Sequence, residues 1–548
     1  MHLFTILAFA ILFWRADSPG EWRLLPADDV FWTLLIVAGQ PLLLLVAGVS
    51  AARRARRLHD KHPEAPQIGQ RFHHRSVFLL RMGLFVGFAA ALLLTPWPDW
   101  FDFGRITPAL QIVGDLIVLS PFFVGALVLW IAAYPAERAL RLIGDPQSYG
   151  GPPTGDPGWR MGAYLDFNLR HHLLVVAAPM TLILFAANMT HGYGVVLRRW
   201  SGWVWMPDVL LAVVAGGVFV VAPVLLCRIW RTAPLESGPL RERLEAICRR
   251  IGLRCRDILI WNSDGIMINA AVMGVFAPVR YVLLSDALLA TMSTRQIEAV
   301  FGHEAGHVRH RHIQHFLVFA LVGWLAVAGL MEGLARTSMD SKAWWGLSST
   351  AIQGLGLAAT VLFWGLGFGW VSRRFERQAD LFGARCVTPS VSECDRPCSV
   401  HPEQVSFLPS GPMCLPPYQG GTKGGSGGAT ITGDALDSRI PRTEDGRVCA
   451  TAAAVFASAL QRVALLNGIP PEERSWRHSS IGSRIRFLVS LAGDPARARA
   501  FERLIRRIKT SLLAAAVLGG AFFIYYWTVL AQPLNPSGVG LIPFPTAR

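Results

Sequence analysis

Residues 301–312 read FGHEAGHVRHRH, and this stretch decides how the rest of the chain is interpreted. His303 and His307 are four residues apart, so on a helix both imidazoles project from one face and can bind the same zinc ion. Glu304 adjoins the first histidine, where its carboxylate can take a proton from an attacking water molecule. The alternative is a basic, histidine-rich segment that only flanks a membrane span.

The composition indicates a membrane protein. The 548 residues are 52% hydrophobic and 16% charged, with 19 tryptophans, which is too apolar for an ordinary soluble protein of this length. The formal net charge of +15 could indicate a nucleic-acid partner. However, Lys and Arg also collect in the cytoplasmic loops of membrane proteins.

Nine apolar stretches are candidates for membrane segments. The first and fifth are short, and the seventh is marginal, against the ~20 residues that a helical span requires. The first lacks the features of a cleaved signal sequence, so we expect it to be retained as an anchor. The stretches are 2–14, 30–50, 77–95, 106–134, 173–187, 209–227, 316–331, 350–371 and 511–531.

Basic residues predict the orientation of these segments. The loop at 51–76 is rich in Arg, whereas the next loop, PWPDWFDFGR, contains only Arg105. This places 51–76 in the cytoplasm, and alternation then places 135–172, 228–315 and 372–510 there as well. The charge is thereby explained, so we expect a lipid bilayer and no nucleic acid as partner. The short outside loops favour a bacterial inner membrane.

The predicted fold class is a mainly α polytopic membrane protein with an α+β domain on its cytoplasmic side. Five parts are expected: an N-terminal membrane region of about six segments, the first half of the soluble domain, a transmembrane hairpin, the second half, and a C-terminal segment with a tail. Their bounds are 1–227, 228–315, 316–371, 372–510 and 511–548.

The first half of the soluble domain predicts the order helix, small sheet, helix. PLRERLEAICRRIGL has helical spacing, and ILIW, IMINAAVM and VRYVLL have the character of strands. The helix that contains His303 should be capped by Ser293, with Gln296 three residues later completing a capping box.

A region at about 390–448 differs from its surroundings. It is rich in Pro, Gly, Ser and Cys, which cannot bury much apolar surface and predicts a flexible insertion. Its GGTKGGSGG run lacks the ending of a phosphate-binding loop. The five cysteines in or beside it are expected to be free thiols in a reducing compartment, with a second metal or a disulfide as the alternative: Cys386, Cys394, Cys398, Cys414 and Cys449.

A catalytic zinc site needs a third protein ligand. The metzincin extension is excluded, since the chain has His310 and Ile313 where that motif needs Gly and His. Glu332 would lie across the membrane. Once the chain has returned through the hairpin, the first acid is Glu376 in SRRFERQADLFGAR, which we predict as the third ligand. The alternative for this segment is a solvated helix face.

Asp380 follows Glu376 by one helical turn and could accept the second N–H of a ligating histidine. The neighbouring histidines His310, His312 and His315 are interpreted as interfacial or solvent-facing, outside the site.

These residues resemble an integral-membrane zinc metallopeptidase family of the HtpX and type I CAAX prenyl protease kind, over about 237–315 and 371–490. INAAVMG is similar to the family's edge strand, which implies substrate binding along Asn269 and Ala270. IEAVFGHEAGHVRHRH and SRRFERQAD look like its zinc helix and E-x-x-x-D segment. The resemblance implies one Zn²⁺ per chain and a zincin-like fold for the soluble domain.

RHSSIGSRIRFL resembles the late H-P-P-x-x-x-R-I segment of the family. The resemblance implies that His478 and Arg484 help to bind substrate or to stabilise an oxyanion. The chain departs from the pattern, because Ser479 and Ser480 replace the common Pro-Pro, and a surface role for His478 is the alternative.

Three hypotheses follow. The first is a metalloendopeptidase that hydrolyses membrane-associated or unfolded proteins, with Glu304 as general base. The second is a membrane sensor-transducer that uses the soluble domain as a relay. The third is a transporter or scaffold with a degenerate metal site, for which the intramembrane residues Asp115 and Arg81 would form a conduction path. The complete set of His303, Glu304, His307 and Glu376 favours the first.

Overall fold

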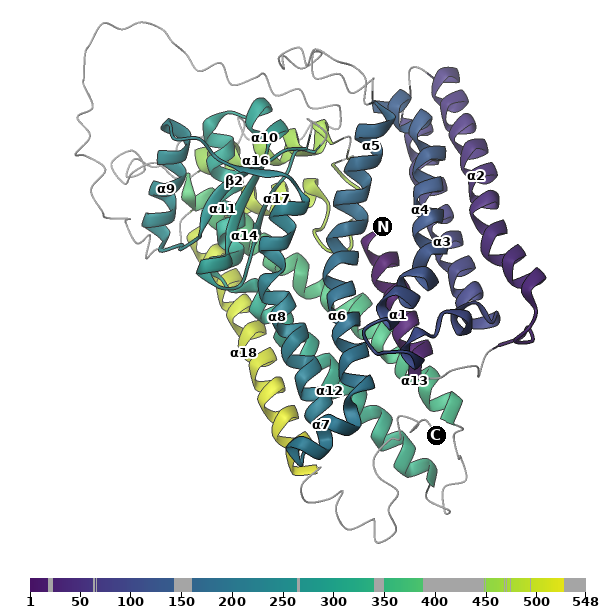
Figure 1. Ribbon diagram of the computed structural model, residues 1–548. Helices are drawn as coiled ribbons and strands as arrows, with labels where there is room; N and C mark the ends of the chain where they lie inside the picture. Colours follow the sequence, from purple (N-terminus) through teal and green to yellow (C-terminus); the bar gives the residue numbers. More distant parts are fainter. Residues whose placement is uncertain are drawn as a thin grey trace, which may run out of the picture. The chain divides into compact units, whose positions relative to one another are not determined.

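The computed structural model describes residues 1–17, 23–62, 65, 67–141, 160–263, 267–339, 349–387, 448, 450–467, 469, 471–473, 475–492 and 494–526. The described residues divide into two compact units, one that ends at Thr232 and one that begins at Ala233. The described residues are mainly helical, with one four-stranded sheet in the second unit (Figure 1).

The first unit is a bundle of apolar helices. Its core contains large buried side chains such as Phe9, Phe88 and Phe122, and α2, α3 and α4 lie side by side (Figure 1). The helices are α1 (His2–Asp17), α2 (Val30–Lys61), α3 (Gln67–Leu94), η1 (Trp97–Phe101), η2 (Phe103–Arg105), α4 (Gln111–Arg141), α5 (Met161–Asn168), η4 (Leu169–Leu174), α6 (Val175–Gly192), α7 (Gly194–Ser201) and α8 (Met206–Ile229).

Among the described residues, 8 helices are long and apolar enough to cross a membrane, and they correspond to all predicted stretches except the first. That stretch forms a shorter apolar helix, His2–Arg15. The fifth stretch looked short, but the span there is Met161–Gly192, because α5, the π-helix η4 and α6 follow one another directly. The marginal seventh stretch lies in a span of 25 residues, His312–Arg336.

The sheet of the second unit has the strand order β1-β2-β4-β3. The strands are β1 (Thr232–Pro234), β2 (Asp257–Trp261), β3 (Ala270–Met273) and β4 (Tyr281–Ser285). β2 pairs with β4 in parallel and β3 pairs with β4 antiparallel. All three predicted strands form, and β3 is an edge strand. The additional strand β1 is only 3 residues long, too short to leave a recognisable pattern.

The helices of the second unit are α9 (Pro239–Ile251), α10 (Asp286–Thr291), α11 (Thr294–Arg309), α12 (His312–Met339), α13 (Ser349–Leu362), η6 (Phe363–Phe368), α14 (Gly369–Cys386), α16 (Ala450–Leu466), α17 (Ile481–Leu491) and α18 (Pro495–Tyr525). One core joins α9, the sheet and α11 through buried residues that include Leu244, Val282 and Phe301. α18 runs along α12 (Figure 1).

The predicted capping box is confirmed and sets the start of α11. The Ser293 side chain accepts from the N–H of Gln296, and the Gln296 side chain accepts from the N–H of Ser293. The chain before it, expected to belong to the same helix, forms the separate helix α10. At the other end Arg311 adopts a left-handed conformation (φ +55°), so α11 stops and α12 begins at His312.

Most of the predicted insertion at 390–448 lies outside the described residues, as do Cys394, Cys398, Cys414 and Cys449. Cys386 is a buried free thiol.

Candidate metal centre

Glycines allow α11 and α14 to pack closely, which brings the two predicted metal-binding segments together. A Cβ added at Gly383 would lie 2.9 Å from both the Ala299 carbonyl oxygen and the His303 nitrogen. A Cβ added at Gly302 would lie 2.7 Å from the Cβ of Cys386. These distances are below ordinary carbon contact distances, so larger side chains would push the two helices apart.

At this helix contact, His303, His307 and Glu376 converge. One potential ligand atom from each lies within 4.8 Å of the others. The Nε2 atoms of the two histidines are 3.3 Å apart. Glu376 Oε2 lies 3.6 Å from His303 Nε2, and Oε1 lies 3.7 Å from His307 Nε2. The structure therefore brings together the three side chains that the sequence predicted as zinc ligands.

Asp380 lies behind the first of these histidines. Its Oδ1 is 3.0 Å from His303 Nδ1, the ring nitrogen on the far side from the converging Nε2 atoms. Asp380 is completely buried and is held through both carboxylate oxygens by Arg484, whose Nε donates to Oδ2 at 2.9 Å. The predicted position of Asp380 beside a ligand histidine is thus found in the structure.

His312 lies behind the second histidine in the same way. Its Nδ1 is 2.9 Å from His307 Nδ1, and its Nε2 is 2.9 Å from Gln378 Oε1. The ring is completely buried and stacks on Phe375 with a centroid distance of 4.5 Å. The sequence interpretation left His312 outside the site, whereas the structure places it against a predicted ligand.

The reason for this difference is the break after α11. On one continuous helix, residues five apart point roughly 140° away from each other at 3.6 residues per turn. The left-handed residue Arg311 turns the chain, so that His312 at the start of α12 faces back toward His307. The sequence carries no clear signal for such a turn at an Arg.

His478 faces the same cluster from the segment before α17. Its Nδ1 lies 3.0 Å from Glu376 Oε1, and 46% of its side chain is exposed. Ser480 caps α17 by accepting from the Ser483 N–H at 3.2 Å, while Ser479 has φ +66°. Proline is fixed near φ −65°, so the backbone at Ser479 is incompatible with the proline that is common in the resembled family.

Glu304 lies on α11, which packs against the edge strand β3. Burial raises the pKa of Glu304 to about 7, and this increase is opposed by the neighbouring His303 and by a backbone hydrogen bond from Val272 in β3. A carboxyl group with a pKa near 7 can both accept and return a proton at neutral pH.

The pKa values of the two histidines differ in direction. Burial lowers the pKa of His307 to about 4, and its neighbour His303 adds to this effect. Burial also favours the neutral form of His303, but the contact with Asp380 outweighs it and raises the pKa of His303. At neutral pH His307 is therefore uncharged, the form that binds a metal ion.

Asn269 and Ala270 lie at the start of the edge strand. The Asn269 carbonyl accepts from the Ser285 N–H at 3.0 Å, so Asn269 is a hydrogen-bonded position of the ladder. Alternation along an antiparallel strand then points the backbone groups of Ala270 and Val272 outward. The Asn269 side chain accepts from the Ala270 N–H.

The donor set fits a zinc ion. Two imidazoles and one carboxylate are an established catalytic ligand set for zinc, and the two Nε2 atoms at 3.3 Å both direct a lone pair at one point if each Nδ1 carries the proton. Asp380 beside His303 Nδ1 stabilises that tautomer. The residues thus form a possible metal-binding group, with further groups that orient the ligands.

Comparisons with known proteins agree with this geometry. Residues 234–415 match the model of peptidase family M48. The chain is 26% identical over 141 residues to CAAX prenyl protease 1 of Saccharomyces cerevisiae (25% of this chain, 31% of that protein). It is 27% identical over 175 residues to a protease HtpX homolog of Pyrobaculum islandicum (31% of this chain, 48% of that protein). The matches thus span about a third to a half of these relatives.

Among solved structures, the crystal structure of S. mikatae Ste24p aligns with 84% of this chain and 100% of that chain, with a TM-score of 0.44 and 14% identity. The sequence matches indicate the class: this part of the chain is similar to peptidase family M48. The resemblance to integral-membrane metallopeptidases of the HtpX and CAAX prenyl protease kind is confirmed, and the apolar helices make the chain a multi-pass membrane protein.

Proposed function

We propose that this protein is an integral-membrane, zinc-dependent metalloendopeptidase that holds one zinc ion per chain through His303, His307 and Glu376. The observation that carries the proposal is the convergence of these side chains from α11 and α14 within 4.8 Å. The two histidines precede the hairpin at 316–371 in the sequence and Glu376 follows it, and all three meet at one point. They lie beside the partly buried carboxyl group of Glu304, which is suited to proton transfer.

His303, His307 and Glu376 would hold a zinc ion, which would supply Lewis acidity to the scissile carbonyl and to the attacking water. Glu304 accepts the proton of that water and delivers it to the leaving amine. His478 is half-exposed and faces the site, so it is well placed to stabilise the developing oxyanion. Arg484 donates hydrogen bonds to Asp380. We propose that supporting Asp380 is its main role and that substrate binding is a lesser one.

The substrate is proposed to bind as an additional strand along β3. Because β3 is the edge of the sheet, the outward carbonyls of Ala270 and Val272 can accept hydrogen bonds from an extended peptide. This position lies beside α11 and hence beside Glu304. Backbone pairing recognises extended segments of many sequences, which suits membrane-associated or unfolded proteins.

We also propose the wider arrangement inferred from the sequence. The α+β domain, with a zincin-like fold, comprises 228–315 and 372–510 and lies on the cytoplasmic side of a bacterial inner membrane. Membrane parts at 1–227, 316–371 and 511–548 anchor it. The basic loops support this orientation.

The experiment that tests the function compares the purified wild type with Glu304→Gln and Glu376→Gln. Zinc content is measured together with cleavage of unfolded casein and of a prenylated peptide. Glu298→Gln is a matched control, because Glu298 lies on the same helix but pairs with Arg243. We expect stoichiometric zinc in the wild type and in Glu304→Gln, with cleavage reduced at least ~100-fold in Glu304→Gln.

Glu376→Gln should lose both zinc and activity, and the casein-to-peptide preference would identify the substrate class. A wild type without zinc, or a Glu304→Gln variant as active as the wild type, would overturn the proposal.

A further inference from the structure

The contacts of His312 continue to a buried cation. Lys509 on α18 donates to the side-chain oxygen of Gln378 at 3.0 Å and to the backbone carbonyl of His310 at 2.8 Å. An ammonium group can only donate, so the Gln378 atom that faces Lys509 is the amide oxygen. The same oxygen faces Nε2 of His312.

Because this Gln378 atom is the amide oxygen, we can assign which nitrogen carries a proton at each contact from Gln378 to His307. The Gln378 oxygen accepts, so His312 Nε2 carries a proton, and in the neutral ring Nδ1 then has the lone pair. His307 must donate to that lone pair from its own Nδ1. The lone pair of His307 Nε2 is left pointing at His303 and Glu376. A doubly protonated His312 would add a second cation beside Lys509.

We propose that His312 is a positioning residue for the metal centre: it orients His307 and fixes its tautomer, through a chain from Lys509 by way of Gln378 to His312. The inference rests on the proposed zinc site. The two ligand histidines are then supported differently, His303 by the buried ion pair of Asp380 with Arg484 and His307 by a neutral imidazole and amide. Such outer partners typically contribute 10–100-fold to metal affinity.

The test measures the zinc dissociation constant of the detergent-purified full chain by competition with a chelator. His312→Phe keeps a ring against Phe375 but removes both nitrogens, and we expect about 10–100-fold weaker zinc binding. Gln378→Met, which removes only the acceptor, should weaken binding less. The double variant should be no weaker than His312→Phe, because both residues act in series.

The control is His315→Phe, which should leave the zinc affinity unchanged, since His315 contacts the Arg311 carbonyl and the ring of Phe375. X-ray absorption should show two histidine ligands in the wild type and in Gln378→Met.

Wild-type affinity in both His312→Phe and Gln378→Met, or three histidine ligands, would overturn the positioning role while leaving the zinc protease intact. Absence of zinc from the wild type would instead overturn the proposed function. If His312→Phe does not fold, Gln378→Met decides alone.

A second, independent observation concerns the membrane bundle of the first unit. Asp115, one of two intramembrane charges noted in the sequence, accepts hydrogen bonds from Asn188 at 2.7 Å and Gln111 at 2.9 Å. Arg81 in α3 is different. It makes no hydrogen bond or ion pair with the residues that the structure describes, and its Nε is buried without a partner.

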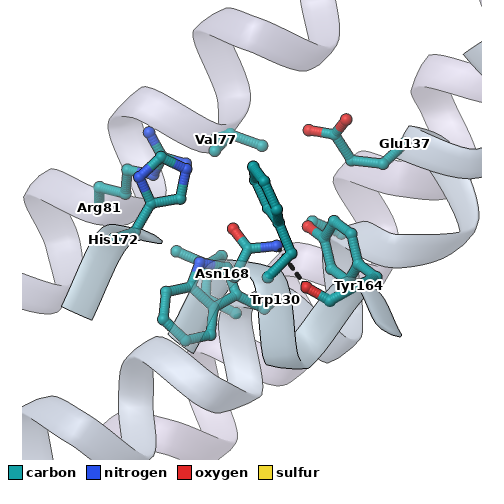
Figure 2. Close-up of a pocket in the computed structure, with 10 residues that line it drawn as sticks. Val77, Arg81, Trp130, Glu137, Tyr164, Asn168 and His172 are labelled. Atoms are coloured by element: carbon teal, nitrogen blue, oxygen red, sulfur yellow. Dashed lines mark hydrogen bonds between the residues drawn. The ribbon is translucent and has the colours of Figure 1, made fainter. Parts of the chain in front are cut away.

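Arg81 lines a cavity of about 70 Å³ between α3, α4, α5 and η4 (Figure 2). His172 lies beside it, with Glu137 on the opposite wall (Figure 2). Glu137 contacts His73 at 3.2 Å and has no ion pair with Arg81. Trp130, only 2% exposed, also lines the cavity, and its Nε1 has no acceptor among the described residues; Nδ1 of His172 likewise has no partner among them.

Nε of Arg81 and Nε1 of Trp130 thus border one cavity, and neither has an acceptor among the residues that the structure describes. Leaving such donors unpaired in an apolar surrounding is unfavourable. The geometry points to a bound anionic group, a phosphate or carboxylate, at Arg81 and Trp130. In a membrane segment the headgroup of an amphiphile can supply it, and free phosphate is the other source.

Native mass spectrometry of the full chain with short-chain phosphatidic acid, a fatty acid or inorganic phosphate tests this site. Arg81→Gln and Trp130→Phe should each weaken binding about tenfold, whereas Arg105→Gln, at the exposed end of η2, should not. Binding of inorganic phosphate alone would identify a free anion. Water as the sole occupant, or equal affinities in all variants, would overturn the site.

Discussion

Arg484 donates to both carboxylate oxygens of Asp380, and one of these oxygens, Oδ1, also lies 3.0 Å from Nδ1 of His303. Arg484 also approaches Glu376, with 3.7 Å between Nη2 and Oε2. A residue introduced by family resemblance as a substrate contact therefore also supports the carboxylate behind a proposed metal ligand. The side chains of Asp380 and Arg484 are 0% and 10% exposed, so bulk water solvates neither charge well.

Removing Arg484 should destabilise the second unit strongly. Arg484→Met leaves Asp380 as a buried carboxylate without its cation, and breaking a buried pair in this way costs about 3–5 kcal/mol. Chemical denaturation in detergent measures this change. Arg486→Met is the matched control two residues away, because its pair with Glu472 is about half exposed, and we expect a loss below ~1 kcal/mol. Equal losses in the two variants would contradict the assignment of Asp380 and Arg484 as a buried support.

The sequence predicted the parts of this centre that depend on local patterns. The capping box at Ser293 set the start of the helix, and the spacing of His303 and His307 placed both on one face. Glu376 was predicted from chain connectivity, because it is the first acid after the membrane hairpin. Each of these inferences needs only residues close in sequence or a known span length.

The contacts that the sequence did not reveal depend on turns and docking. His312 reaches His307 only because the chain turns at Arg311. Arg484 reaches Asp380, 104 residues earlier, only because α17 packs on α14. Neither event leaves a periodic signal. The strand β1 was missed for a simpler reason, since 3 residues carry too little pattern.

The close approach of α11 and α14 gives a second prediction. Gly383→Ala would push its Cβ against the backbone of Ala299 and His303, which should destabilise the protein by about 1–3 kcal/mol and weaken zinc binding, because the helix carrying Glu376 moves away. Gly329→Ala is the control: its Cβ meets nothing within 4 Å, and alanine favours a helix. Thermal unfolding and zinc titration report the two effects. Unchanged zinc affinity in Gly383→Ala would show that the helix spacing does not set the ligand geometry.

The edge strand gives a third prediction. Val272→Pro removes an outward N–H without breaking the ladder with β4, a position that tolerates proline. Loss of the hydrogen bond from the Val272 N–H to Glu304 should lower kcat/KM by about fivefold to tenfold, equivalent to about 1 kcal/mol. Ala271→Pro instead removes a ladder hydrogen bond opposite Leu283 and should reduce stability. Peptide cleavage and thermal unfolding together separate the two cases, and identical behaviour of the variants would rule out the assigned register.

The final prediction concerns a thiol away from the metal centre. A hydrogen bond from Cys248 lowers the pKa of Cys255 to about 7, with Arg280 adding to the effect and burial opposing it. Because the pKa is lowered, the reactive thiolate is present above about pH 7 and is lost as the pH falls through that value. Alkylation of Cys255 by iodoacetamide, followed by peptide mass spectrometry, should therefore show a midpoint near pH 7.

Cys248→Ala removes the donor and should move this midpoint up toward the ordinary thiol value of about 8.5, so that alkylation at pH 7 becomes several-fold slower. The buried thiol of Cys386, whose pKa is raised by burial to about 12, serves as an internal reference that stays unmodified in both proteins. An unchanged midpoint in Cys248→Ala would mean that Cys248 does not stabilise the thiolate of Cys255.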